Sequence, residues 1–324
     1  MKLEKVTEPI PLIGHIAFGI IDRGTNMLQV RPFSNCPMSC IFCSVDAGPN
    51  TKTRVTEYIV DSDHLINWVN EVVNIKTHEV SILIDGVGEP LLHPDIVKIV
   101  KGIKENKKVI EIAVETHGLP LTEGLIKALA DAGLDRINLS IDSLDIEKAK
   151  RLSGHKGYDV LKVIKMAEFA SSLGIKIMLT PVWIKGINDE DIKEIVRYGK
   201  ERGFTFGIQK YMEHERGRNL GIRISWKEFY EFLEEIEKEE GIRLIISPSD
   251  FKVYKDRTLG PVFNEGERVI GEVVLDGWRK GETIIQAKNR LITLVGINSE
   301  VPKGISLRGK IIRNKDEIYL AKPV

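Results

Sequence analysis

The chain of 324 residues has few cysteines, little glutamine and no net charge. Its three cysteines all lie within residues 36–43, so none is left for structural disulfides, and a reducing cytoplasm fits best. Basic and acidic residues number 47 each, so net charge gives no information about partners. No apolar run is long enough to span a bilayer, and the first residues lack the apolar core of a signal peptide. These absences predict a cytoplasmic protein with no membrane partner. Abundant Lys, Glu and Ile beside scarce Gln suggest a thermophile.

The three cysteines share one loop, residues 35–43, with the spacing C-x3-C-x2-C. Thiolates this close can bind a single soft metal centre. Structural zinc takes four ligands, and a cubane iron–sulfur cluster takes one cysteine per iron. Three cysteines would therefore leave one iron of a cubane open to a substrate. The alternatives are incidental cysteines or a zinc site completed by a distant histidine, and the confinement of all three cysteines to one loop argues against both.

Cys36, Cys40 and Cys43, with Phe42 directly before the last of them, resemble the signature of the radical S-adenosylmethionine (SAM) superfamily. The resemblance implies a [4Fe–4S] cluster whose open iron binds the amino and carboxylate groups of SAM. It also implies cleavage of SAM to methionine and a 5′-deoxyadenosyl radical, which removes a hydrogen from the substrate. A low-potential electron donor, ferredoxin or flavodoxin, is then an expected partner.

Beyond the cysteine loop, apolar strands and amphipathic helices alternate with short connections up to about residue 246. This alternation predicts an α/β domain of βα units around a parallel sheet. About six units are too few for a closed eight-fold barrel, but they suit the open partial (βα)6 TIM-like barrel of the family that the loop resembles. Residues 1–256, including an N-terminal hairpin and a last strand at 244–246, are assigned to this domain.

From residue 257 the pattern changes to five short strands separated by Gly, Asp and Asn turns. These strands predict a small C-terminal β-barrel domain at 257–324, which resembles a TRAM or OB-like RNA-binding barrel. Basic residues outnumber acidic ones here, and Trp278 and Tyr319 are candidates for stacking on a base. The resemblance implies an RNA substrate, tRNA in particular. The alternative is a barrel that only packs on the catalytic domain.

Ligands of parallel βα folds bind at the carboxyl ends of the strands, so residues that follow each strand are site candidates. Gly88 and Glu89 follow the strand at 80–84 and resemble the family motif assigned to the SAM amino group, with Val87 in place of a glycine. Thr116 follows the next strand and resembles a threonine that faces SAM. His117 replaces the asparagine of that motif, so its role is open.

Two further segments resemble the molybdenum-cofactor-cyclase branch of the family. Ser140 and Asp142 lie on one face of the strand that begins at residue 136, and the resemblance places the serine against SAM. Arg151 resembles an arginine close to SAM, where it would pair with a carboxylate. The substrate-side candidates follow the strand at 204–209, and a charged surface loop is their alternative: Tyr211, Glu213, Arg216 and Arg218.

No cysteine follows Cys43. The cyclase itself carries a second three-cysteine cluster near its C-terminus, so cyclisation of the molybdenum-cofactor precursor is not expected here. The predicted function is radical SAM modification of a nucleoside in tRNA, and no catalytic residue is assigned. The alternatives are a small-molecule or peptide substrate, with the barrel structural, and a non-catalytic, metal-stabilised RNA-binding protein.

Overall fold

The computed structural model describes residues 1–297 and 299–324, and these form two compact units. Unit 1 consists of Met1–Asn35, Lys52–Ile110 and Tyr254–Val324, and unit 2 of Cys36–Thr51 and Glu111–Val253. The cysteine loop thus belongs to the same unit as the later βα elements, and the C-terminal barrel to the same unit as the earlier ones. The domain boundary predicted at residue 257 follows from a change in the sequence pattern. The two units follow from the packing of the folded chain, so they do not test that boundary.

Unit 1 contains the predicted hairpin, in which β2 and β3 are antiparallel; β3 also pairs in parallel with β5, and β1 with β4. In α2, apolar side chains at helical spacing form the buried face, as the sequence pattern predicts. The elements before the barrel are β1 (Lys2–Val6), β2 (Gly19–Asp22), β3 (Met27–Arg31), β4 (Thr56–Val60), α1 (Ser62–Ile75), β5 (Val80–Ile84), η1 (Pro90–Leu92) and α2 (Ile96–Lys104).

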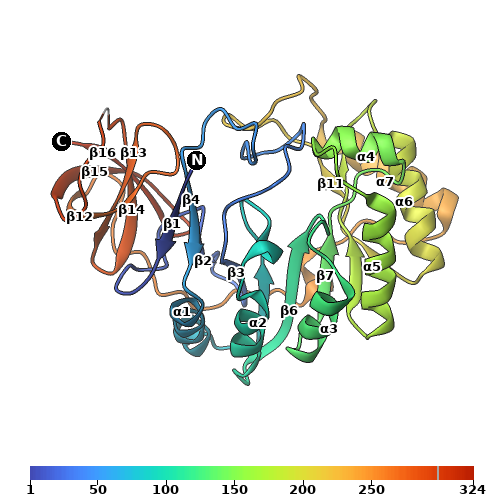
Figure 1. Ribbon diagram of the computed structural model, residues 1–324, viewed down its shortest axis with the longest axis horizontal. Helices are drawn as coiled ribbons and strands as arrows, with labels where there is room; N and C mark the ends of the chain where they lie inside the picture. The colour runs from blue at the N-terminus through green and yellow to red at the C-terminus, as the bar shows by residue number, and fades with distance from the viewer. Residues whose placement is uncertain (298) are drawn as a thin grey trace. The chain divides into compact units, whose positions relative to one another are not determined.

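The five strands at the C-terminus close into a barrel with the order β12-β13-β14-β16-β15, as predicted (Figure 1). β14 and β16 are parallel, and the other neighbouring strands are antiparallel. Inward-facing apolar residues such as Val269, Ile292 and Ile311 fill the barrel. The strands are β12 (Arg268–Asp276), β13 (Glu282–Ala287), β14 (Arg290–Val295), β15 (Ser306–Lys315) and β16 (Ile318–Pro323).

The outer face of β13 and β14 is covered by the chain's own N-terminal segment. Leu291 lies next to the inward-facing Ile292 and is nevertheless fully buried. Its amide donates to the Ile13 carbonyl (2.8 Å), and a Cβ on Gly14, whose φ is +119°, would lie 2.1 Å from the Leu291 carbonyl oxygen. Only glycine permits so close an approach of the two backbones.

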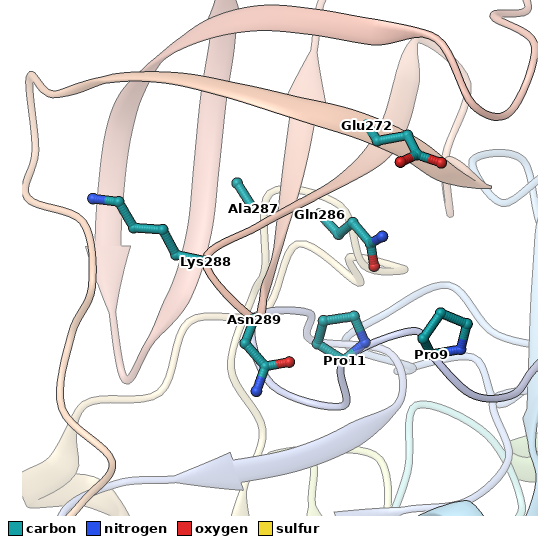
Figure 2. A pocket seen from close by; sticks show the side chains of 7 residues that line it. All are labelled: Pro9, Pro11, Glu272, Gln286, Ala287, Lys288 and Asn289. Atoms are coloured by element: carbon teal, nitrogen blue, oxygen red, sulfur yellow. The ribbon is translucent and has the colours of Figure 1, made fainter.

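This cover ends at the turn between β13 and β14. Figure 2 shows Pro9 and Pro11 below the turn residues Lys288 and Asn289, around a pocket of about 320 Å³. The N-terminal segment therefore lies against β14 and against the turn that precedes it.

Unit 2 continues the alternation of strands and helices. β6, β7, β8 and β10 are neighbours in that order, and all pair in parallel. α5 packs on β8 and against α3, and α6 packs on β10 (Figure 1). The elements are β6 (Val109–Thr116, which starts in unit 1), α3 (Glu123–Asp131), β7 (Arg136–Leu139), α4 (Ile146–Ser153), α5 (Val160–Ser172), β8 (Lys176–Leu179), β9 (Val182–Trp183), α6 (Asp189–Glu201), β10 (Thr205–Phe206), β11 (Gln209–Lys210), α7 (Trp226–Glu240) and η2 (Pro248–Phe251).

The strand predicted at 244–246 is wrong. The amides of Leu244 and Ile245 both donate to Oε1 of Glu237 on α7 (2.6 and 2.9 Å), so a side chain takes the place of a neighbouring strand. In the part of the chain that the structure describes, no helix is both long and apolar enough to cross a bilayer.

Candidate active site

The cysteine loop is bound to the C-terminal end of α4. The amides of Ser39 and Ile41 donate to the carbonyls of Ser153 and Leu152, both at 3.0 Å. The last carbonyls of a helix have no partner inside it, so these bonds satisfy both segments. A Cβ on Gly154, which ends α4 at φ +60°, would lie 2.1 Å from the Ser39 carbonyl oxygen. The glycine after α4 is therefore explained by the approach of the cysteine loop.

Arg218 holds the same loop from another side. Its guanidinium donates to the carbonyls of Cys40 (3.0 Å) and Ala47 (2.5 Å) and pairs with Asp46 (3.0 Å). Its amide donates to the Cys43 carbonyl at 2.8 Å. The substrate contact predicted for Arg218 is not tested by these bonds, but they direct its donors to the loop. No local sequence pattern indicates this role, because the partners of Arg218 lie about 170 residues away along the chain.

The three thiols are close enough to affect one another. Cys36 and Cys40 are buried, Cys43 is partly buried, and none forms a disulfide. Burial raises the pKa of the Cys40 thiol well above its usual value, and negative charge on Asp142, Cys36 or Cys43 would raise it further. Cys43 Sγ accepts a hydrogen bond from the Ala47 amide at 3.2 Å. Thiols in such surroundings become thiolates only with a positive partner, such as a metal centre.

The chemistry of these residues fits a [4Fe–4S] cluster. No three His, Cys, Asp or Glu side chains among the described residues are arranged around one metal position. A cubane binds each cysteine to a different iron, so its ligands are spread more widely than those of one zinc ion. The donor set is three soft sulfurs on one loop, which is the chemistry that such a cluster takes.

His117, at the end of β6, faces the cysteine loop. Its Nε2 lies 3.6 Å from Cys40 Sγ, and its carbonyl accepts a hydrogen bond from the Tyr158 hydroxyl at 2.8 Å. Burial lowers the pKa of His117 to about 4, so the imidazole is neutral near pH 7. Thr116 is buried, and its hydroxyl accepts from the Gly118 amide (2.9 Å), which fixes the turn after the strand.

Polar residues at the ends of β7 and β8 adjoin this region of unit 2. The Ser140 hydroxyl donates to the Thr180 carbonyl at 3.3 Å. Asp142 accepts from the Val182 amide at 2.8 Å, and the Asn188 side chain donates to the Asp142 carbonyl at 3.2 Å. Burial raises the pKa of Asp142 to about 7, against the Val182 hydrogen bond, which lowers it. The carboxyl of Asp142 is thus able to hold or release a proton near neutral pH.

The glycine–glutamate loop of unit 1 lies against the residues that precede the first cysteine. A Cβ on Gly88 would lie 2.2 Å from the Ser34 carbonyl oxygen, so this position requires glycine. The Glu89 amide donates to the Asn35 carbonyl at 2.9 Å. The Glu89 carboxylate is buried, and its Oε1 accepts from the Leu91 amide at 3.2 Å. Contact of Gly88 and Glu89 with SAM stays a prediction.

Arg54 connects this loop with the barrel, and sequence analysis missed it. Its guanidinium donates to the carbonyls of Ser34 (3.1 Å) and Val87 (2.5 Å) and pairs with Glu57 (3.1 Å). It also lies 4.7 Å from the centre of the Trp278 ring, in the loop between β12 and β13. A single arginine outside any motif gives no sequence signal for such a role.

Both aromatic residues proposed to stack on bases are in the interior. Trp278 is 2% exposed and Tyr319 is fully buried. The Arg279 guanidinium also lies over the Trp278 ring, 4.3 Å from its centre, and the Tyr319 hydroxyl accepts from the Val262 amide at 3.0 Å. The prediction that Trp278 or Tyr319 stacks on a base is therefore wrong. Both side chains are buried, in the barrel core and at its interface with β4.

The remaining candidates are dispersed. Tyr211 is buried, and its hydroxyl accepts from the Leu220 amide at 2.8 Å. Glu213, Arg216 and Arg151 are exposed, and Phe42 is buried within the cysteine loop. Their predicted contacts with substrate or SAM stay predictions.

Known proteins support the assignment that the loop suggests. The sequence model of the radical SAM superfamily matches residues 30–199. An uncharacterised protein of Methanocaldococcus jannaschii is 38% identical over 98% of this chain and 80% of its own length. A GTP 3′,8-cyclase of Aliarcobacter butzleri is 31% identical over 59% of this chain, which spans only 57% of that enzyme. Streptococcus suis SuiB has the same fold, with a TM-score of 0.56 and 20% identity over 68% of this chain and 48% of SuiB.

These matches confirm the predicted TIM-like α/β fold with its additional barrel. Radical SAM enzymes use a [4Fe–4S] cluster together with SAM, and these are the cofactors of this enzyme. The chain belongs to the radical SAM superfamily.

Proposed function

We propose that Cys36, Cys40 and Cys43 hold the cluster and that the enzyme modifies a nucleoside in tRNA. The first part is supported by the three mutually close thiols on a loop held by α4 and Arg218. When bound, the cluster supplies one electron to SAM, which breaks a carbon–sulfur bond and gives methionine and a 5′-deoxyadenosyl radical. Ferredoxin or flavodoxin is the proposed donor of that electron, and the reducing cytoplasm is the proposed location.

The residues proposed to hold SAM divide into two sets. Gly88 lets its loop lie against the backbone of Ser34, and the buried Glu89 carboxylate would accept the ammonium group. In unit 2, Ser140 offers a hydroxyl, and Arg151 offers a guanidinium for the carboxylate. The other proposed contacts are Phe42, Thr116 and Asp142.

Anaerobic reconstitution tests the cofactor assignment. The protein should bind about four irons per chain and, with dithionite, convert SAM to 5′-deoxyadenosine. Cys36→Ala, Cys40→Ala and Cys43→Ala should each lose the cluster absorbance and this activity. A colourless protein that binds zinc and leaves SAM intact would instead support the non-catalytic, metal-stabilised RNA-binding protein.

The RNA part of the proposal is supported by one exposed, basic face of the barrel. Across three neighbouring strands, Arg268 on β12 pairs with Lys310 on β15, which pairs with Lys322 on β16. Arg308 lies two residues from Lys310 on the same side. All four are exposed, and none forms an ion pair with a described residue. Four unpaired cations on one face suit the phosphates of a nucleic acid.

One observation favours the second candidate, a small molecule or peptide. In OB-type barrels, oligonucleotides bind on the face of the second and third strands. Here that face is β13 and β14, and residues 9–14 of the chain lie against β14 and the turn between the two strands. Comparison of the modified nucleosides in tRNA from a deletion strain and its parent separates the candidates, because only the tRNA enzyme leaves a nucleoside missing.

A further inference from the structure

Unit 2 has an open groove of about 620 Å³ along α4 and α5, and its lining contains none of the residues assigned above to SAM. Its lining combines apolar and basic side chains. Ile146 and Leu161 are 38% and 43% exposed, so the groove presents apolar surface to solvent. Met166 adds a flexible apolar side chain of the kind found at protein-binding surfaces.

Lysines dominate the charge of the groove. Lys150 pairs with Glu147 (2.8 Å), whereas Lys156, Lys162 and Lys165 form no ion pair with a described residue. The acidic residue of the lining, Asp159, uses its carboxylate to cap α5 through the Lys162 amide at 3.1 Å. The groove therefore presents three unpaired cations on a chain with no net charge.

The groove is connected to the cysteine loop by two routes. Tyr158, which lines it, donates to the His117 carbonyl at 2.8 Å, and the His117 ring lies 3.6 Å from Cys40 Sγ. The carbonyls at the end of α4 accept hydrogen bonds from the loop itself. A protein bound in the groove would thus be separated from a cluster ligand by two side chains.

We propose that this groove docks an acidic, one-electron carrier protein and that Tyr158 and His117 connect that carrier to Cys40. The inference rests on the proposed function, since only a cluster on Cys40 gives the carrier an acceptor. Unpaired lysines around an apolar centre suit an acidic protein, and electron-transfer complexes use small interfaces, below about 1,200 Å². The aromatic residue of the groove lining, Tyr158, is only 3% exposed and offers no free ring face to a base, so RNA is the poorer fit.

The test follows reduction of the reconstituted enzyme by reduced flavodoxin or by a two-cluster ferredoxin, with stopped-flow absorbance as the readout. Lys156→Gln/Lys162→Gln should slow reduction on the order of tenfold at low ionic strength, and the difference should disappear at high salt. The control Lys227→Gln/Lys238→Gln removes two exposed charges from α7 and should reduce at the wild-type rate. Reduction of all variants by dithionite should be equal.

If the carrier reduces Lys156→Gln/Lys162→Gln and Lys227→Gln/Lys238→Gln at the same rate, the proposed docking site is wrong. It is also wrong if the groove variant loses RNA binding but keeps its rate of reduction by the carrier. Tyr158→Phe tests the connection separately, because it keeps the charge of the groove and removes the hydrogen bond to His117. It should bind flavodoxin with unchanged affinity and accept its electron more slowly; an unchanged rate would refute the role of Tyr158. The two proposals can fail separately. If the wild-type protein cleaves no SAM after reduction by dithionite but still binds flavodoxin, the result contradicts the proposed function and not the docking site.

Discussion

At the scale of single residues, burial sets the protonation of the groups beside the cysteine loop. It lowers the pKa of His117 to about 4 and raises that of Asp142 to about 7, so both are neutral at slightly acidic pH. A neutral imidazole and a protonated carboxyl are hydrogen-bond donors, and donors to cluster sulfurs are among the factors that set a cluster's potential. The surroundings of Cys40 therefore change with pH through Asp142.

Asp142 gives a stability prediction with a definite sign. Between its ordinary pKa of 3.8 and about 7, the folded state holds a proton that the unfolded chain has released. The contribution of Asp142 to the free energy of unfolding therefore falls as pH rises through this range. Asp142→Asn keeps an acceptor for the Val182 amide and should raise the free energy of unfolding at pH 8, by on the order of 3 kcal/mol, and by much less at pH 5.

Urea unfolding of the metal-free protein at both pH values measures this difference. Asp131→Asn, at the exposed end of α3, controls for the loss of one carboxylate. An equal effect of Asp142→Asn at pH 5 and pH 8 would show that the carboxyl does not titrate in this range.

Residue identities near the cysteines could be predicted only where spacing along the chain carries the information. The motif of Cys36, Cys40 and Cys43 lies within one short segment, so the sequence alone is enough to identify it. The bonds of Arg218 to the loop and of His117 to Cys40 join residues far apart in sequence, and no local pattern encodes them. The place of Tyr211 after a strand predicts a substrate contact, whereas its burial depends on tertiary packing that no local pattern encodes.

At the scale of elements, strand and helix periodicity predicted most of the architecture, because each pattern reflects burial on a face of one segment. The start of α7 follows local sequence chemistry, because Ser225 and Glu228, three residues apart, form a capping box. The strand at 244–246 failed because its amides bind a side chain of α7. The contact between the N-terminal segment and β14 could not be predicted either, because it joins residues near the two ends of the chain.

Arg54 makes the barrel part of the support of the glycine–glutamate loop. It is buried with Glu57, whose other carboxylate oxygen accepts from the Ser34 hydroxyl, and it contacts Trp278. Arg54→Ala leaves the Glu57 charge buried and unpaired, so it should lower the free energy of unfolding by about 3–5 kcal/mol. Hydrogen exchange at residues 85–89 should rise in this variant, while exchange in α7 should not.

Adding Glu57→Gln to Arg54→Ala removes the unpaired buried charge, so the double variant should recover part of the lost free energy of unfolding. Hydrogen exchange at residues 85–89 should stay fast, because the arginine is still missing. A single Arg54→Ala variant with wild-type exchange in that loop would refute the connection between barrel and loop.

At the scale of the whole molecule, the barrel is not a separate unit, because it packs in one compact unit with earlier parts of the chain. The barrel shares unit 1 with the glycine–glutamate loop, which is one of the segments proposed to hold SAM. Its covered face and its interior aromatic residues leave the exposed side of β12, β15 and β16 for any RNA. Sequence composition revealed the excess of basic residues, but it could not show on which face they gather.

Salt dependence of RNA binding tests that face. Each cation that contacts a phosphate releases a counterion, so Arg308→Gln/Lys310→Gln should weaken binding of an RNA duplex on the order of tenfold and make the slope of log K against log salt less negative by about two. Fluorescence anisotropy at several salt concentrations measures both quantities, with Lys227→Gln/Lys238→Gln as the charge-matched control. Because the face has no exposed aromatic side chain, the effect should be the same for duplexes of different sequence. An unchanged slope would remove the barrel from RNA recognition and leave the small-molecule or peptide substrate as the better candidate.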